Sequence, residues 1–193
     1  MPSTHFETIK QVINHRRAIF PPSYTAQAIP KELLTELLAC ANAAPTHKLT
    51  QPWRFVVFRE QGLARLADQL ASLYKAQTPP EQFLQKKLEN TRDKVLRSGA
   101  VAAIIVSYSG AVPKWEELAA TACAVQNLWL AASAAGIGGY WSSPSTIIHH
   151  IGDFLDMAPH EECLGFFYMG YHDEPPREAN RLPVESKVHW VDE

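Results

Sequence analysis

The amino-acid sequence predicts an α+β fold in which helices wrap a mostly internal β-sheet. Two short runs, 53–58 and 101–106, are rich in aromatic, β-branched or uniformly apolar residues, which is typical of strands in a buried sheet. Several longer segments instead carry apolar residues at helical spacing. No repeat or low-complexity block interrupts the 193 residues, so we expect one domain over residues 1–193.

The predicted helices differ in how much of their surface is apolar. Helices are expected over 6–16, 30–44, 62–74, 80–97, 115–135 and 145–155. The segment 80–97 is charged with a thin apolar face, so it could be either part of the core or a mobile cover. The segment 115–135 is alanine-rich and apolar nearly all round. A helix of that kind is expected at the centre of the assembly or at a subunit contact.

Two further strands complete the predicted sheet. They are expected over 138–141, directly after Gly136, and over 164–171. Residues after Glu174 form a polar tail punctuated by prolines, and the tail closes on the more apolar residues 188–191.

Composition excludes several classes of protein. The net charge of −2 argues against a nucleic-acid partner, and no apolar stretch approaches the 18 residues of a membrane span. The first residues lack the basic and apolar regions of a signal peptide. Cys40, Cys123 and Cys163 are widely spaced, with no Cys-x-x-Cys pair to suggest a metal cage. We therefore expect buried free thiols and a cytoplasmic protein.

Common catalytic motifs are missing. The chain contains no Gly-x-Ser-x-Gly, His-Glu-x-x-His or P-loop. His149 and His150 are adjacent and would point about 100° apart on a helix, so a surface or capping role fits better than a shared metal. The glycines of 136–139 follow a helix and precede a strand, which is the reverse of the dinucleotide-binding turn.

Four other segments could bind a cofactor. Arg16 and Arg17 end the first helix and could hold a phosphate through two guanidinium groups, although an isolated Arg pair is more often a solvated helix end. The loop 44–53 places amide and hydroxyl groups at the rim of the sheet, where they could contact a flat polar heterocycle. Small residues in 139–144 would let backbone N–H groups approach a ring. Arg181 stands alone in the polar tail.

The order of these segments resembles the FMN-dependent nitroreductase family. The elements are Arg-Arg near the start, Ala-Pro-x-x-x-x-x-Gln-Pro-Trp, Gly-x-Gly-Gly-x-Trp, and Arg-Leu-Pro near the end. The chain looks most like the compact branch without large insertions, whose second element carries Ala-Pro-x-His-Lys. The match spans residues 12–190.

The resemblance implies a set of cofactor contacts. The residues expected at FMN are Arg16, Arg17, Ala18, Thr46, His47, Gln51, Trp141, Ser142, Ser143 and Arg181. The three arginines would hold the phosphate. His47 would reach the flavin from the second subunit, and Gln51 would lie near the ribityl chain and ring. Residues 141–143 would lie against the isoalloxazine, with a main-chain N–H directed at N5.

The resemblance also implies a mixed central β-sheet wrapped by helices, in an interlocked homodimer with two flavin sites at the interface. NAD(P)H would reduce the flavin, and a small-molecule electron acceptor such as a nitroaromatic or quinone would then take two electrons in a ping-pong scheme. No protein acid or base is required, so no catalytic side chain is predicted. The alternatives are a non-catalytic flavin-binding sensor or carrier, and an unrelated hydrolase built on Cys123 or His149.

The sequence departs from the family pattern at three places. Ala18 replaces a serine, which removes one hydrogen bond worth about 1 to 3 kcal/mol of cofactor affinity. Phe20 replaces a lysine and Leu49 replaces an asparagine. The positive charge near N1 and O2 of the flavin must then come from elsewhere, and Lys48 is one candidate.

Overall fold

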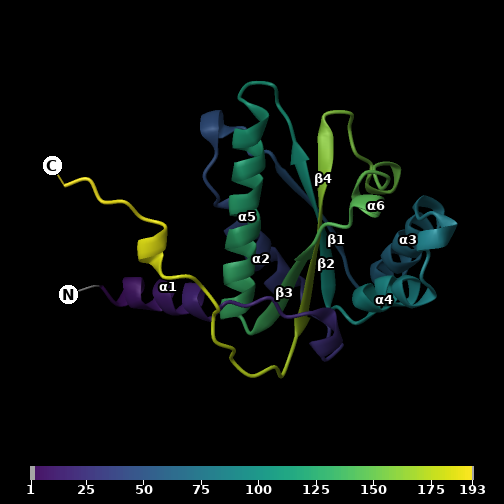
Figure 1. Cartoon of the computed structure of the whole chain (residues 1–193), viewed down its shortest axis with the longest axis horizontal. Helices are drawn as coiled ribbons and strands as arrows, with labels where there is room; N and C mark the ends of the chain where they lie inside the picture. The colour runs from purple at the N-terminus through teal and green to yellow at the C-terminus, as the bar shows by residue number, and fades with distance from the viewer. Residues whose placement is uncertain (1–2, 193) are drawn as a thin grey trace.

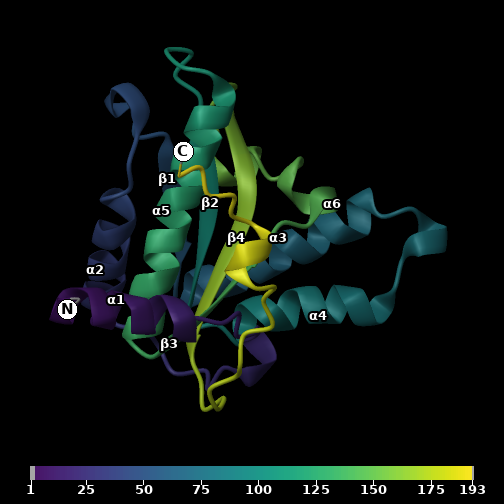
Figure 2. The same cartoon turned by 60° about the vertical axis from the view of Figure 1, so that its left-hand side comes forward.

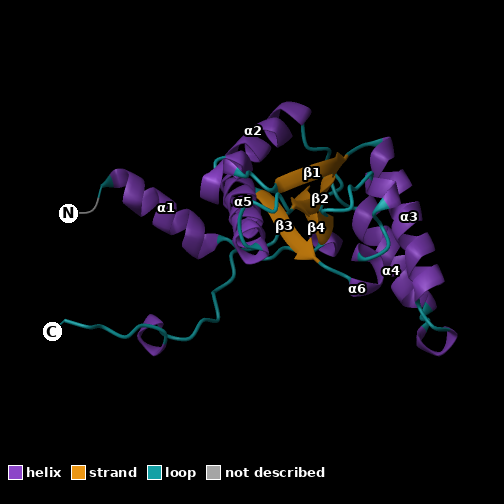
Figure 3. Cartoon of the chain, turned by 90° about the horizontal axis from the view of Figure 1, so that it is seen from above, coloured by secondary structure: helices purple, strands orange, loops and turns teal. Residues whose placement is uncertain are grey.

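The computed structural model describes residues 3–192 and contains a four-stranded β-sheet with helices on both faces (Figure 1). The strands are β1 (Trp53–Phe58), β2 (Ala100–Ser107), β3 (Ile137–Ser142) and β4 (Glu161–Tyr171), in the order β1-β2-β4-β3. The helices are α1 (Thr4–His15), α2 (Lys31–Asn42), α3 (Gln61–Gln77), α4 (Gln85–Leu96), α5 (Lys114–Ala134) and α6 (Ser145–Ile148). Viewed from above, α2 and α5 cover one face, and α3 and α4 cover the other (Figure 3).

The sheet is packed on both faces because β2 is apolar at every buried position. Val101, Ala103 and Ile105 belong to the core under α3. Ala102 and Ile104 alternate with them and belong to the core under α2 and α5. Side chains in a strand point to opposite faces in turn, so an uninterrupted apolar run is needed here. The predicted doubly buried strand is thus confirmed.

All neighbouring strands pair antiparallel, which differs in detail from the mixed sheet expected. Among the described residues, parallel pairing is confined to an isolated bridge between Ala18 and Gly139. The Ile19 N–H donates to the carbonyl of Gly139 at 3.1 Å. The segment after α1 therefore lies along the outer edge of β3, and this carries the predicted phosphate-binding residues to the sheet.

Helix α1 extends away from the body of the chain (Figures 1 and 3). The Ser3 hydroxyl caps it by accepting from the Phe6 N–H at 3.3 Å, as N-cap serines do. None of its residues is buried, and Phe6, Ile9 and Ile13 are all about half exposed. The apolar residues that predicted this helix thus form a face that no other part of the same chain buries.

The charged segment 80–97 is not one helix. Pro80–Gln82 forms a 3₁₀ turn, the chain is extended at Phe83, and α4 begins only at Gln85. Val95 is fully buried and Leu88 packs against the same core. The inner face of α4 therefore belongs to the core, which is one of the two roles left open by the sequence.

The predicted helix 145–155 is also interrupted. Helix α6 ends at Ile148, and a separate 3₁₀ turn spans Asp153–Leu155. Ile147, Ile151 and Leu155 are nevertheless all buried, as the apolar spacing required. The apolar spacing thus predicted correctly which side chains are buried, but it did not predict that the helix is interrupted.

All three cysteines are free, but only one is buried. Cys163 lies in the core, where burial raises the pKa of its thiol to about 11. Cys40 and Cys123 are exposed on α2 and α5, contrary to the expected buried thiols.

Two kinds of feature are absent from residues 3–192. None of the described helices combines the length and apolar content needed to cross a membrane. The described residues also form no group of three or more His, Cys, Asp or Glu side chains suited to a metal ion.

Candidate functional site

Three arginines from distant parts of the chain meet beside the end of α5. Arg16 caps the C-terminus of α1, and its guanidinium lies over the Trp129 ring, 4.4 Å from the ring centroid. Its pKa is lowered by burial and then by the charges of Arg181 and Arg17. Within residues 3–192, none of the three arginines has a carboxylate within 4.0 Å.

Two buried N–H groups near this cluster also have no hydrogen-bond partner. They are the Nε1 of Trp129 and the Nε of Arg17. Buried polar groups are normally paired, because leaving one unpaired costs about 1 to 3 kcal/mol. An anion would pair with such donors and relieve the repulsion among the arginines. The residues present therefore fit a phosphate-bearing cofactor.

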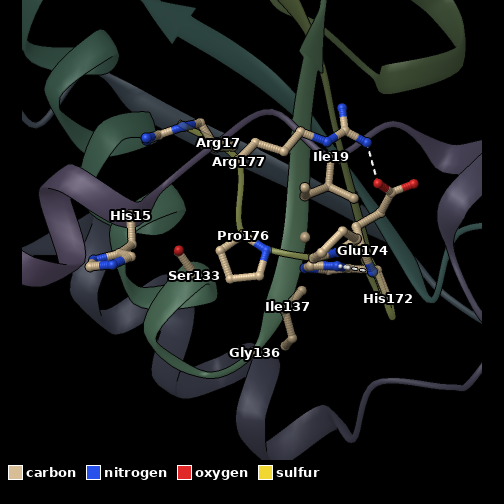
Figure 4. A pocket seen from close by; sticks show the side chains of 12 residues that line it. His15, Arg17, Ile19, Ser133, Gly136, Ile137, His172, Glu174, Pro176 and Arg177 are labelled. Atoms are coloured by element: carbon tan, nitrogen blue, oxygen red, sulfur yellow. Dashed lines mark hydrogen bonds and ion pairs between the residues drawn. The ribbon is translucent and has the colours of Figure 1, made fainter. Parts of the chain in front are cut away.

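Arg17 differs from Arg16 in where it points. Its Nη1 donates to the backbone carbonyls of Asn14 at 2.6 Å and Arg16 at 2.8 Å. Its side chain lines a cavity of about 280 Å³ together with Ile19 and His172 (Figure 4). The structure thus turns the Arg17 guanidinium back toward α1, and its direct contact with a phosphate stays a prediction.

Gly138 and Gly139 are required by packing. A Cβ on Gly139 would lie 2.5 Å from the Phe167 ring and 2.9 Å from the Trp129 Nε1, and one on Gly138 would lie 2.8 Å from the Ile19 Cβ. Such distances are too short for real contacts. The sequence suggested that the small residues of 139–144, Gly139 among them, let backbone N–H groups approach a cofactor ring. In the structure Gly139 makes room for Trp129 and Phe167, and Gly138 makes room for the segment after α1.

The segment 141–143 is fastened to β4. The Trp141 Nε1 donates to the Leu164 carbonyl at 3.0 Å, and the Ser143 hydroxyl donates to the same carbonyl at 2.6 Å. The next residue, Gly165, has φ +126°, and a Cβ there would lie 2.4 Å from the Ser142 carbonyl oxygen. Two of the predicted flavin contacts, Trp141 and Ser143, therefore already serve to hold this segment, whereas Ser142 lines a cavity beside α4.

The loop that carries Thr46, His47 and Gln51 has a strained backbone. Lys48, Leu49 and Gln51 all adopt positive φ, between 43° and 55°, which is uncommon for residues other than glycine. The Thr46 hydroxyl holds the loop by accepting from the Gln51 N–H at 3.1 Å. Strain of this kind tends to be kept at functional positions.

His47 binds within its own chain in this structure. Its Nδ1 lies 2.5 Å from Oε2 of Glu116, in the first turn of α5. The neighbouring Lys48 donates to the Ala111 carbonyl at 3.3 Å. A role for His47 as a cap of α2, which is the structural alternative to a flavin contact, does not match these contacts, because its partner lies on α5.

The predicted site residues thus form two separate groups. The loop group meets α5 at Glu116, and the arginine group meets it at Trp129. Trp129 is thirteen positions after Glu116 on the same helix, which corresponds to about 20 Å along its axis. Figure 1 shows the two ends of α5, with α1 beside the C-terminal end. One chain alone therefore does not bring all the predicted residues together.

Sequence reasoning missed Trp129 and Tyr140. Trp129 was read as one more apolar residue of an alanine-rich helix, although an indole can both stack on a guanidinium and donate a hydrogen bond. Tyr140 packs against Phe20, with 4.6 Å between the ring centroids. The aromatic pair occupies the place where the resemblance led us to expect a lysine.

A small antiparallel sheet covered on both faces, with an uncompensated arginine cluster at its edge strand, defines an α+β protein built to hold a phosphate-bearing cofactor. Residues 13–171 match the model of the nitroreductase family, so the chain belongs to that family. The protein "Putative NAD(P)H nitroreductase YfhC" of Bacillus subtilis is 27% identical over 194 residues, covering 97% of this chain and 98% of YfhC.

Solved structures agree with this assignment. A nitroreductase-like family protein from Bacillus cereus has a TM-score of 0.84 at 26% identity, over 96% of each chain. The FMN-dependent nitroreductase NfnB from Mycobacterium smegmatis, solved with NADPH, has a TM-score of 0.77 at 17% identity, over 97% of this chain and 99% of NfnB. The predicted nitroreductase-like fold and the class of nitroreductase-type flavin oxidoreductase are confirmed.

Proposed function

We propose that this protein is an FMN-dependent homodimer that takes a hydride from NAD(P)H and reduces small oxidised acceptors. The observation that carries the proposal is the arginine cluster beside the unpaired Trp129 Nε1, at the edge strand of a nitroreductase fold. FMN-dependent enzymes occur among the structural neighbours, and NfnB was solved with NADPH. The cysteines are free thiols, as is usual in the reducing cytoplasm, and the proposed reductant NAD(P)H is also available there.

The proposal gives each group of residues a task. Arg16 and Arg181 bind the phosphate by charge-assisted hydrogen bonds, and Arg17 adds positive charge from the other side of the segment. Residues 141–143 lie against the ring, beside the cavity that Ser142 lines. When bound, FMN would supply the redox chemistry, with NAD(P)H and the acceptor using it in turn. The chain itself binds, orients and shields the reacting groups.

The two separated groups of site residues support a dimer. A second copy, related by a two-fold axis, would bring its own Thr46, His47 and Gln51 to the arginine group of the first. Its interface has an apolar surface to cover. On α5, Trp115 is 67% exposed and Leu118 is 42% exposed, and the apolar face of α1 is open.

The C-terminal tail is the second surface that a partner would cover. Residues after Glu174 run away from the sheet (Figure 1). The tail carries Leu182, Val184, Trp190 and Val191, each of which is more than 60% exposed. A tail of this kind can interlock two subunits by packing on the neighbour.

Purified protein tests the proposal directly. We expect a yellow protein with a flavin absorption spectrum, bleached without oxygen by NADH or NADPH and restored by a quinone or a nitroaromatic. Bound flavin that NAD(P)H does not reduce would support the sensor or carrier alternative instead. A colourless protein that takes up no added FMN would contradict the proposal.

A hydrolase built on Cys123 or His149 has little structural support. Cys123 lies exposed on α5, and His149 is an exposed C-cap residue of α6.

Sedimentation tests the dimer separately. A stable monomer at micromolar concentration that keeps its flavin would contradict the shared site.

A further inference from the structure

A cavity of about 270 Å³ lies between α4 and the segment that follows β3. One wall is a single face of α4, where Lys87, Asn90, Thr91 and Lys94 recur at helical spacing. The opposite wall contains Ser142, one of the residues predicted to contact the flavin. Figure 2 shows α3 and α4 side by side, with α6 near the end of α3.

The cavity carries unbalanced positive charge. Among the described residues, its lining includes two lysines and no aspartate or glutamate. The Lys87 Nζ lies 5.3 Å from the ring centroid of Tyr74, and the Lys94 Nζ lies 6.0 Å from that of Tyr140. Neither lysine is within 4.0 Å of a carboxylate in residues 3–192. Both ammonium groups are thus held over aromatic faces and remain available to an anion.

The neutral groups around the lysines suit an aromatic ring with a polar substituent. Leu70, Tyr74 and Tyr168 supply apolar and aromatic surface, and Asn90 and Ser142 supply uncharged hydrogen-bonding groups. The volume of about 270 Å³ lies just below the usual range for ligand pockets, about 300 to 1,000 Å³. It therefore suits a molecule with one ring better than a whole dinucleotide.

We infer that this cavity selects electron acceptors that have a single aromatic ring and carry an acidic group. The inference rests on the proposed function, because it assigns the substrate class of that same site. Lys87 and Lys94 bind the acidic group, and the ring lies toward Ser142. Lys94 also introduces positive charge beside Tyr140, which packs against Phe20 at the position where the family pattern led us to expect a lysine.

Two acceptors of matched size test the inference. 4-Nitrobenzoate carries a carboxylate, and 4-nitrobenzamide replaces it with a neutral amide. In the FMN-loaded protein with NAD(P)H, we expect Lys87→Met combined with Lys94→Met to lower kcat/KM for 4-nitrobenzoate at least tenfold, mainly through KM. The value for 4-nitrobenzamide should change less than twofold. Lys86→Met is the matched control, since Lys86 is an exposed lysine of the same helix outside the cavity.

Binding of benzoate, which is not reduced, provides a second measurement. Calorimetry on the FMN-loaded protein should show benzoate binding that weakens at least tenfold in the double variant, and Lys94→Arg should retain it. If the wild type reduces no acceptor but binds benzoate through these lysines, the proposed function fails and the anion site stands. If both acceptors and benzoate are unaffected by the double variant, or both acceptors are lost equally, the inference is wrong.

Discussion

Arg16 and Arg181 are 165 positions apart in the sequence, yet in the folded chain the charge of Arg181 helps to lower the pKa of Arg16. Folding brings like charges together here, and within residues 3–192 none of the three arginines pairs with a carboxylate. In the flavin-free protein the cluster is therefore a source of repulsion, and the bound phosphate would turn it into a source of attraction. Stability and cofactor affinity should respond in opposite directions when the cluster is removed.

The first prediction concerns these opposite changes in stability and cofactor affinity. Arg16→Ala combined with Arg181→Ala should yield folded, largely colourless protein, because each arginine contributes roughly 1.5 to 3 kcal/mol as a charge-assisted donor. The thermal stability of the flavin-free protein should stay the same or rise. Flavin titration and thermal melts measure the two effects. Arg177→Ala is the control, since Arg177 already pairs with Glu174. Full flavin occupancy in the double variant would remove both arginines from the site.

At this scale the sequence predicted which arginines matter but not what they contact. Arg16 could be assigned from a motif, whereas its stacking on Trp129 depends on the angle at which α1 meets α5. Gly139 of β3 was assigned to the cofactor, although Phe167 and Trp129 fill the space beside it. Contacts between distant residues are set by the tertiary fold, which no local pattern encodes.

At the scale of elements, the sequence predicted strands better than helix ends. Residues 53–58 match β1, and 101–106 form the centre of β2. Short runs of β-branched, aromatic or uniformly apolar residues favour strands, so these two segments were readily recognised. The breaks after Ile148 and at Phe83 were missed. Apolar periodicity reports which side chains are buried, and the chain can bend between turns while keeping the same face inward.

The loop before β4 depends on one ion pair. Arg54 of β1 donates from Nε and Nη2 to the two carboxylate oxygens of Glu161, at 2.8 and 2.7 Å. The same Nη2 donates to the Asp156 carbonyl, and the Ala158 N–H donates to Glu161. The hydrogen bond from Arg54 is the main cause of the lowered pKa of Glu161.

The second prediction concerns the pH dependence of this pair. Because the folded pKa of Glu161 lies below its ordinary value of 4.5, the pair stabilises the fold fully above that pH. The contribution is lost as the pH falls through the lowered folded value. Glu161→Gln should therefore cost about 1 to 3 kcal/mol at pH 7 and progressively less below pH 4.5. Urea unfolding at several pH values measures this difference.

The control for that experiment is Glu162→Gln. Glu162 is exposed and lies 3.5 Å from the exposed Lys114, so its contribution should stay below about 1 kcal/mol at every pH. An equal cost for the two substitutions, or a cost of Glu161→Gln that does not fall in acid, would contradict the role given to the Arg54 pair.

At the scale of the whole molecule, the predicted site residues contact α5 at two separate positions. About 20 Å of helix separates the loop group from the arginine group, so one site must draw on both subunits if both groups bind the same flavin. Strand direction and the uncovered face of α1 were not readable from the sequence, because both depend on how distant segments are arranged. The apolar segment 115–135 suggested a subunit contact, and the family resemblance suggested that the contact forms a dimer.

The third prediction tests the shared site by mixing subunits. A homodimer of Arg16→Ala and a homodimer of His47→Ala should each bind flavin more weakly at both sites. A hybrid of one subunit of each should have one intact site, with wild-type affinity, and one doubly defective site. Flavin titration of hybrids purified through two different tags should therefore give one tight equivalent per dimer. If each chain builds its own site, the hybrid will have no tight site.

The distance in sequence between Arg16 and Arg181 has a consequence for the order of events in folding. Closing a loop of that length carries a high entropic cost, so this contact should form late, after the sheet. A ligand that needs the contact cannot stabilise the folding transition state, and its binding energy appears in the native state alone. Stopped-flow experiments should therefore show that FMN leaves the first-order refolding rate unchanged and slows unfolding. A faster refolding rate with FMN would place the contact in the folding nucleus.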